Sequence, residues 1–181
     1  MDNHLVMPIT NADHALGPSN APLTLVEYGD YECPYCSEAF DVVLALQRTF
    51  AGKLRFVYRN FPLVNQHPHA EFAAEVAEAV GELGEFWEMH DLLFENHDAL
   101  EIDDLLRYVD DTAVDQDRVA AIIASGQPRE RVHSDVAGGL RSGVAGTPTF
   151  FVNGTLYEGS WELAPFEKYL KTLLHTTSAQ S

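Results

Sequence analysis

Cys33 and Cys36 are the only cysteines of the chain, and they lie three positions apart in a Cys-Pro-Tyr-Cys motif. The apolar residues 23–26 upstream predict a buried strand, and the apolar spacing across residues 37–50 predicts a helix. A strand that leads into Cys-x-x-Cys at the start of a helix is the arrangement of a dithiol redox centre. The motif therefore constrains the fold more than any other feature, because a strand and a helix must meet at the cysteines.

The predicted start of the helix gives the two cysteines different chemistry. Cys33 is expected at the helix N-terminus, where unpaired N–H groups and the helix dipole stabilise a thiolate. Cys36 is expected one turn further along and more buried, where it can attack a mixed disulfide formed by Cys33. Pro34 fits the first turn, because its missing N–H has no partner there in any case. The spacing thus predicts Cys33 as the attacking cysteine and Cys36 as the resolving one.

Three other interpretations of the cysteine pair stay open. A zinc site needs about two further ligands beyond one Cys-x-x-Cys. No second cysteine pair exists, so we expect no metal; the histidines that might complete a site are His67, His69, His90 and His97. A structural disulfide across so short a loop would stabilise the fold little. The third interpretation is a pair that has lost its activity.

Composition and charge limit the class of protein. The 181 residues, 46% of them hydrophobic, are enough for one domain with a core. The net charge of −17, from 11 basic and 28 acidic residues, disfavours nucleic acids and anionic membranes as partners. No run approaches the roughly 18 apolar residues of a membrane span, and residues 1–8 lack a signal-peptide pattern. As written, the chain is expected in the cytoplasm; a leader trimmed from the sequence would change this expectation.

The remaining patterns predict a β-α-β unit, a helical block and a β-β-α unit. Strands are predicted at residues 23–28 and 54–60, and helical spacing extends across residues 66–141. Asn153-Gly154 lies between two short apolar runs and predicts a tight hairpin turn. A last helix is predicted at residues 162–174. Two strands joined by a helix pair in parallel, and the hairpin adds antiparallel strands beside them.

This order divides the chain into four predicted parts. Residues 1–22 form an N-terminal arm with a short edge strand at residues 5–9. An α/β domain with a mixed sheet comprises residues 23–65 and 142–175. Residues 66–141 are a helical insertion into that domain, because the sheet needs strands from both sides of them. Residues 176–181 are predicted to be a disordered tail.

A second motif, Gly-Thr-Pro-Thr at residues 146–149, precedes the predicted hairpin. Pro148 cannot donate to a strand ladder, so it is expected at a strand entry. A cis Thr147–Pro148 bond would form a tight turn that presents the backbone of Thr147 to an extended substrate segment. The alternative is an ordinary trans proline.

The run from Leu25 to Cys36, together with Gly-Thr-Pro-Thr, resembles the DsbA-like branch of the thioredoxin superfamily over residues 14–175. Residues 67–70 and 86–90 also resemble bacterial members, some free-standing and some fused behind sodium/proton antiporters. The resemblance implies a thioredoxin-like mixed sheet with a helical insertion and a cis Pro148. It further implies a thiol–disulfide oxidoreductase that acts on protein thiols and disulfides. Such an enzyme needs no cofactor beyond its own cysteine pair.

The resemblance also assigns roles to residues. It makes Cys33 the nucleophile and Cys36 the resolving cysteine. Glu27 takes the position of a buried acid that accepts the proton of Cys36, which requires a pKa raised by burial; the alternative is a solvated carboxylate at the strand end. The residues implied to face the substrate are Pro34, Tyr35, Thr147 and Pro148. We assign no chemistry to His67 or His69.

The chain departs from strongly oxidising members at Tyr35, where those proteins have histidine. A phenol cannot carry the positive charge with which an imidazole stabilises a thiolate, and the motif resembles that of glutaredoxin instead. Acidic residues Asp30, Glu32 and Glu38 also disfavour a thiolate. We therefore expect a reduction potential below the roughly −120 mV of DsbA, nearer about −200 to −270 mV. The alternative function is a non-catalytic redox sensor or a chaperone-like binding module.

Overall fold

The computed structural model describes residues 3–178 of the chain. At its centre is a five-stranded mixed sheet of order β1-β3-β2-β4-β5. Strands β2 and β3 are parallel, and the other neighbouring pairs are antiparallel. The strands are β1 (His14–Leu16), β2 (Leu23–Gly29), β3 (Leu54–Asn60), β4 (Thr149–Val152) and β5 (Thr155–Leu156). The predicted parallel pair and antiparallel hairpin are therefore both confirmed.

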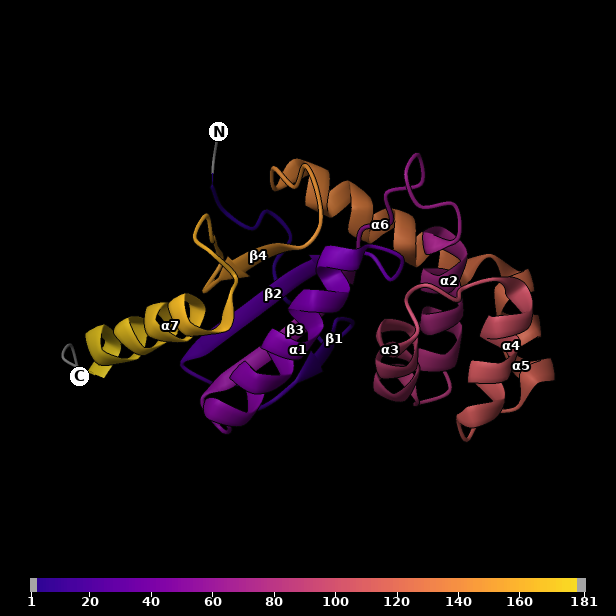
Figure 1. Cartoon of the computed structure of the whole chain (residues 1–181), viewed down its shortest axis with the longest axis horizontal. Coiled ribbons are helices and arrows are strands. Elements are labelled where there is room, and N and C mark those ends of the chain that lie inside the picture. Colours follow the sequence, from indigo (N-terminus) through magenta and orange to yellow (C-terminus); the bar gives the residue numbers. More distant parts are fainter. Residues whose placement is uncertain (1–2, 179–181) are drawn as a thin grey trace.

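The helices fall into a pair beside the sheet and a block at one end of it (Figure 1). The pair is α1 (Pro34–Thr49) and α7 (Leu163–Ser178). The block connects β3 to β4 and comprises α2 (Ala70–Gly81), α3 (Phe86–Glu95), α4 (Ile102–Asp111), α5 (Gln116–Ser125) and α6 (Gln127–Arg141). Asp115 caps α5, because its side chain accepts the Arg118 N–H. Among residues 3–178 no helix is both long and apolar enough to cross a membrane.

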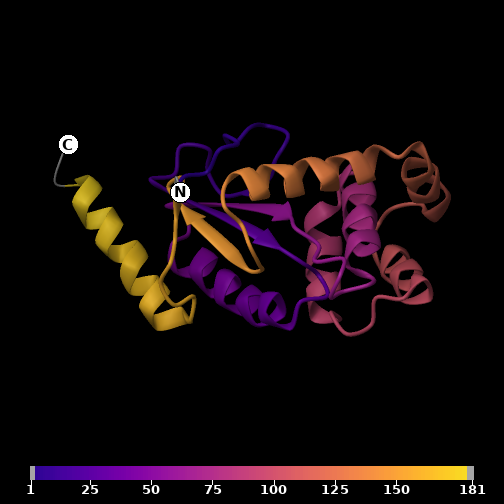
Figure 2. The same cartoon turned by 90° about the horizontal axis from the view of Figure 1, so that it is seen from above.

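Each face of the sheet is buried against a different set of helices. Alternate residues of β2 face opposite ways, so Leu25 packs with α1, α3 and α7, whereas Val26 packs with Val136 of α6 and with the N-terminal arm. Figure 2 shows the sheet lying between α1 and α6. This two-sided burial explains why the first residues of β2, 23–26, are largely apolar and do not alternate with polar ones. The fold is thioredoxin-like α/β with the predicted helices between its two halves.

Helix α6 approaches the sheet closely through a pair of glycines. A Cβ at Gly139 would lie 2.8 Å from the Phe61 ring and 3.0 Å from that of Tyr28, and one at Gly138 would lie 3.0 Å from Met7. Any larger side chain would push the helix away. Helix α6 thus starts in the helical block and ends on the sheet. The domain boundaries at residues 66 and 141 stay predictions.

Two predictions about the ends of the chain were wrong. Residues 5–9 do not form an edge strand, because the edges are β1 and β5 and the carbonyls of Met7 and Pro8 accept from the Arg59 guanidinium instead of from a ladder. Among the described residues, only an isolated bridge, between His4 and Thr155, joins the N-terminal segment to β5. The predicted disordered tail begins too early, because α7 continues to Ser178. Residues 179–181 lie outside the described part of the chain.

Candidate active site

Cys33 and Cys36 lie where β2 passes into α1. Cys33 is the N-cap residue with extended backbone angles (φ −79°, ψ 119°), and its carbonyl accepts the Cys36 N–H at 3.0 Å and the Ser37 N–H at 3.1 Å. Both cysteines are reduced and buried. Between them Tyr35 is 62% exposed. The loop therefore presents Pro34 and Tyr35 to solvent, with the sulfur atoms just beneath.

The two thiols have pKa values shifted in opposite directions. A hydrogen bond from the Cys36 thiol, helped by the N–H groups of Cys36 and Tyr35, outweighs burial and lowers the pKa of Cys33 to about 5. Burial raises the pKa of Cys36 well above its usual value, and the charge of Glu27 adds to this. At neutral pH the site thus holds one thiolate and one thiol. This is the state in which Cys33 can attack a disulfide while Cys36 is kept in reserve.

The Thr147–Pro148 loop lies against the cysteines. The Thr147–Pro148 peptide bond is cis, and in the thiol form Cys33 Sγ donates to the Thr147 carbonyl at 3.6 Å. Thr149 Oγ1 donates to the Gly146 carbonyl at 2.7 Å and closes the turn. Two segments separated by 114 positions in the chain therefore meet at one sulfur atom.

Glu27 lies on β2 beneath the cysteines and is only 2% exposed. The interpretation of Glu27 as a solvated strand-end carboxylate is therefore wrong. Its Oε1 atom has no hydrogen-bond partner among the described residues. Burial, with the negative charge of Cys33, raises the pKa of Glu27 to about 8. A carboxyl group in this range can exchange a proton with a thiol, as Cys36 requires when it attacks.

A buried tyrosine next to Glu27 was not found from the sequence. In the parallel pair β2 and β3, Tyr58 is the register partner of Glu27, so both side chains face α1. The Tyr58 hydroxyl also lacks a hydrogen-bond partner among the described residues. Its ring lies 5.3 Å from that of Tyr31, whose hydroxyl pairs with His90 Nδ1 at 3.0 Å. Only the register of the two strands brings these groups together, and no local signal marks them.

Two histidines pair with acids beside the motif. Asp30 is buried and pairs with His67 Nδ1 at 2.8 Å, and Glu32 pairs with His69 Nδ1 at 2.8 Å. Burial opposes protonation of His67, but the hydrogen bond and charge of Asp30, with a smaller effect of the Cys33 charge, outweigh it and raise its pKa. Of the three acids expected to disfavour the thiolate, Asp30 and Glu32 are thus each hydrogen-bonded to a histidine, which the sequence did not indicate. Each pair joins residues 37 positions apart, too far for a local pattern to reveal.

His90, also named as a possible zinc ligand, does not face a metal site. His90 is buried among aromatic rings, and this burial lowers its pKa to about 3, so it is neutral. Among residues 3–178 no group of three or more His, Cys, Asp or Glu side chains is arranged to hold a metal ion. The cysteine pair therefore has no further ligands around it within this part of the chain.

Comparison with protein families and sequences finds a family model and two curated relatives. A family model described as Thioredoxin matches residues 10–172. A protein from Salinispora arenicola named Na(+)/H(+) antiporter NhaA 1 is 46% identical over 160 residues, which cover 88% of this chain and 24% of the relative. An NhaA antiporter from Nitrosospira multiformis is 37% identical over 180 residues, or 98% and 29% of the two chains. The chain thus spans about a quarter of the length of these curated relatives.

Solved structures give the same fold. BdbD from Bacillus subtilis matches with a TM-score of 0.83 and 22% identity, covering 97% of this chain and all of that one (100%). Wolbachia pipientis α-DsbA1 matches with a TM-score of 0.82 and 21% identity over 99% of each chain. A thioredoxin-like oxidoreductase from Silicibacter pomeroyi gives 0.80 and 24%, over 90% of this chain and 92% of that one. At these identities the likeness is one of fold.

Proposed function

This chain belongs to the thioredoxin family and has the fold of its DsbA-like members, and from this premise we propose that it is a thiol–disulfide oxidoreductase acting on protein substrates through Cys33 and Cys36. The observation that carries the proposal is the reduced Cys33–Cys36 pair at the start of α1 with the cis Thr147–Pro148 loop against Cys33 Sγ. The opposed pKa shifts, to about 5 for Cys33 and well above the usual value for Cys36, agree with it. A structural or inactive pair has no need of one stabilised thiolate beside one reserved thiol. No cofactor is needed beyond the cysteine pair.

The proposed reaction has two thiol–disulfide exchanges. In the reducing direction, the Cys33 thiolate attacks one sulfur of a substrate disulfide, and the other substrate sulfur leaves as a thiolate. Cys36 then gives up its proton and attacks Cys33 Sγ, so the first substrate sulfur also leaves and takes up a proton. Two electrons pass from the dithiol to the substrate, and a Cys33–Cys36 disulfide remains. Oxidation of a substrate dithiol is the same sequence reversed.

Glu27 is the proposed proton acceptor for Cys36. It is buried on the same side of the sheet as Cys36. The charge of Cys33 raises the pKa of Glu27, and the charge of Glu27 raises the pKa of Cys36. When Cys33 becomes part of a mixed disulfide, its negative charge disappears and the pKa of Glu27 falls, because that charge is one of the two causes that raise it. Glu27 can therefore ionise as the second step begins, and as a carboxylate it can take the proton that Cys36 releases.

The substrate is proposed to bind across the surface formed by Pro34, Tyr35 and the Thr147–Pro148 loop. Pro34 and Tyr35 are exposed, and Thr147 lies within hydrogen-bond distance of Cys33 Sγ. An extended segment bound there would bring its disulfide to the attacking sulfur. The substrate disulfide is therefore proposed to lie in an unfolded or flexible segment of a protein.

The proposed reduction potential lies between those of DsbA and thioredoxin. The Cys33 pKa of about 5 falls between roughly 3.5 for DsbA and 7 for thioredoxin. A more stable thiolate favours the reduced form and makes the disulfide more oxidising. Redox titration in glutathione buffers should therefore give a value between about −120 and −270 mV, and a value outside these limits would contradict the argument.

Insulin reduction tests the activity itself. The wild-type chain should accelerate turnover, Cys33→Ser should abolish it, and Cys36→Ser should accumulate a mixed disulfide that is visible on a non-reducing gel. Turnover that survives Cys33→Ser would refute the proposal. If the pair oxidises reversibly without any Cys33-dependent turnover, the redox sensor or binding module is the better assignment.

A further inference from the structure

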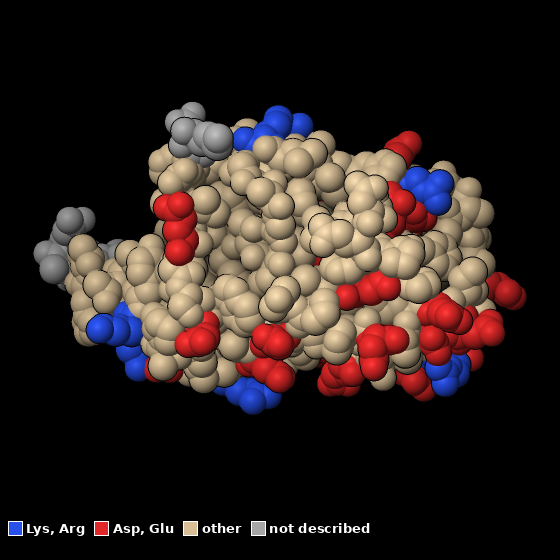
Figure 3. Space-filling model, turned by 45° about the horizontal axis from the view of Figure 1, so that its top comes forward, with Lys and Arg blue, Asp and Glu red and all other residues tan. Residues whose placement is uncertain are grey.

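Negative charge is concentrated in the helical block. Residues 66–141 carry 18 acidic and five basic side chains, a net charge of −13 out of −17 for the whole chain. Within them, residues 101–117 carry seven acidic side chains and one basic one, and that one, Arg107, is already bonded to Asp104. Figure 3 shows acidic side chains gathered at the right-hand end of the molecule, where Figure 1 places α4 and α5. Most of the net negative charge of the chain is therefore carried by the helical block.

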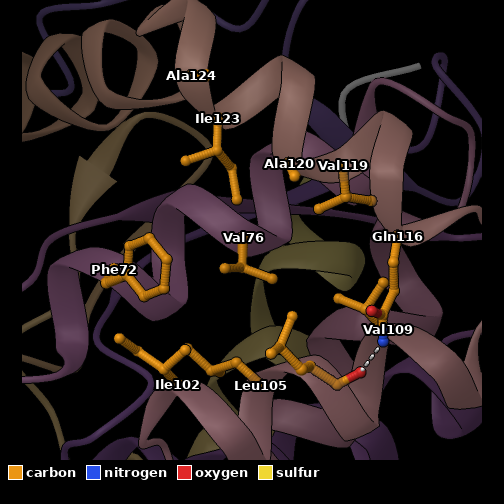
Figure 4. A pocket seen from close by; sticks show the side chains of 11 residues that line it. Phe72, Val76, Ile102, Leu105, Val109, Gln116, Val119, Ala120, Ile123 and Ala124 are labelled. Carbon is orange, nitrogen blue, oxygen red and sulfur yellow. Dashed lines mark hydrogen bonds between the residues drawn. The ribbon is translucent and has the colours of Figure 1, made fainter.

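An apolar cleft lies within the same acidic region. It has a volume of about 250 Å³ and is bounded by α2, α4 and α5. Figure 4 shows side chains of these helices pointing into it, among them Phe72, Val76, Ile102, Leu105, Val119 and Ile123. The polar lining residue is Gln116, whose amide donates to the Leu106 carbonyl and to Asp110 Oδ1. Because that amide is bonded within the protein, the cleft offers a ligand an apolar surface.

Two apolar side chains at the cleft are open to water. Ile102 is 63% exposed and Leu106 is 45% exposed, and both line the cleft. Exposed aliphatic side chains beside a hollow are the kind of surface that marks an interaction site on a monomer. Acidic residues adjoin these positions: Ile102 lies between Glu101 and Asp103 in the chain, and Gln116 lies between Asp115 and Asp117. The cleft is therefore apolar within an anionic surround.

We propose that this cleft binds a basic amphipathic helix of a protein partner. A helix places apolar side chains on one face at i, i+3 and i+4, which can fill a groove between two helices, and its flanks can carry lysine or arginine. Helices α4 and α5 have ten residues each, about 15 Å, which matches nearly three turns of a docked helix. The surrounding carboxylates would attract a cationic partner and speed its association.

Charge also argues against the other occupants. A second copy of the chain brings the same net charge of −17 and the same acidic rim. The chain's own last helix, α7, lies at the opposite end of the molecule from α4 and α5 (Figure 1). The cleft is separate from the proposed redox site, because α2, α4 and α5 bound it whereas both cysteines lie at the start of α1. A partner bound there would use a second surface of the protein, beyond the proposed function.

The test is binding of a designed peptide to the whole chain. The probe is a fluorescein-labelled 18-residue peptide of leucine and lysine with leucine at helical spacing, followed by fluorescence polarisation. The wild-type chain should bind it saturably, with an affinity that weakens as salt is added. The double substitution Ile102→Gln/Leu106→Gln should weaken binding by about tenfold or more, because it removes two apolar contacts. Both positions are exposed, so folding should be retained.

Matched controls separate the cleft from the general charge of the protein. Leu140→Gln changes a 61% exposed leucine on α6 outside the cleft and should leave binding unchanged. A leucine and glutamate peptide of the same pattern should not bind. Asp103→Asn/Asp117→Asn should weaken binding and flatten its salt dependence, whereas Asp41→Asn on α1 should not.

Three results would overturn the inference. One is binding that survives Ile102→Gln/Leu106→Gln, which would make it nonspecific attraction to an acidic protein. Another is equal binding of the glutamate peptide. The third is a dimer of the chain in sedimentation that the same double substitution dissociates, since the cleft would then hold a second copy. Insulin reduction measured on every variant should stay at the wild-type rate, so failure of this inference and failure of the proposed enzyme activity are separate observations.

Discussion

Replacing the buried Glu27 with glutamine should stabilise the reduced protein at neutral pH. Glutamine is close in shape to a protonated glutamate but cannot ionise. Burial and the charge of Cys33 raise the pKa of Glu27 from 4.5 to about 8. The folded protein therefore holds this proton up to about pH 8, whereas the unfolded chain releases it above about pH 4.5. Between these values the unfolded state gains free energy from ionisation, so the wild-type protein loses stability as pH rises.

The size of the effect follows from the same shift. One pKa unit corresponds to about 1.36 kcal/mol, so the 2.5 units between the usual pKa of 4.5 and pH 7 amount to about 3 kcal/mol. Glu27→Gln should raise the free energy of unfolding by about that amount at pH 7. The gain should vanish below about pH 4 and level off above about pH 8, once both states have released the proton.

Urea unfolding of the reduced protein across pH 4 to 9, with a phosphine reductant present, measures this directly. Glu158→Gln is the matched control, because Glu158 is exposed and its substitution should have little effect at any pH. A gain that does not depend on pH would refute the reasoning, as would a less stable Glu27→Gln at pH 7. The same variant should also resolve a mixed disulfide about 10²-fold more slowly, because the proposed proton acceptor of Cys36 is gone. Stopped-flow release of a labelled substrate thiol would show it.

Three further substitutions test the surroundings of the motif. His67→Gln removes a cation whose pKa is raised by Asp30 and by the Cys33 charge, so the pKa of Cys33 should rise above about 5 in the pH profile of thiolate absorbance; an unchanged profile would contradict this. The stability that His67 contributes should be present below its usual pKa of 6.5 and be lost as pH rises through its raised folded value. Gly139→Ala places a Cβ 2.8 Å from the Phe61 ring and should cost about 1–3 kcal/mol in urea unfolding; a cost near zero would mean that α6 can shift freely. Tyr35→His puts an imidazole at an exposed position beside Cys33 and should make the reduction potential less negative in glutathione titration, and a more negative value would count against the electrostatic argument.

Local patterns predicted much of the fold correctly. Strand β3, from Leu54 to Asn60, coincides with its prediction, and the Asn153-Gly154 turn has the two positive φ angles (48° and 79°) that such a hairpin needs. These features depend on a few neighbouring residues, so spacing and turn chemistry are enough to find them. The edge strand predicted at residues 5–9 was wrong because a residue far along the chain binds its backbone: the Arg59 guanidinium donates to the carbonyls of Met7 and Pro8.

The sequence by itself determined where the chemistry is, because Cys33 and Cys36 follow a buried strand and open a helix, and those signals are local. Only the tertiary structure decided how that chemistry is tuned. The charge on a side chain depends on burial and on neighbours brought from far along the chain, as with Glu27 beside Tyr58 and Asp30 beside His67. A sequence shows which acids surround a thiol, but the folded protein decides which of them are buried, which are paired, and which can still take a proton.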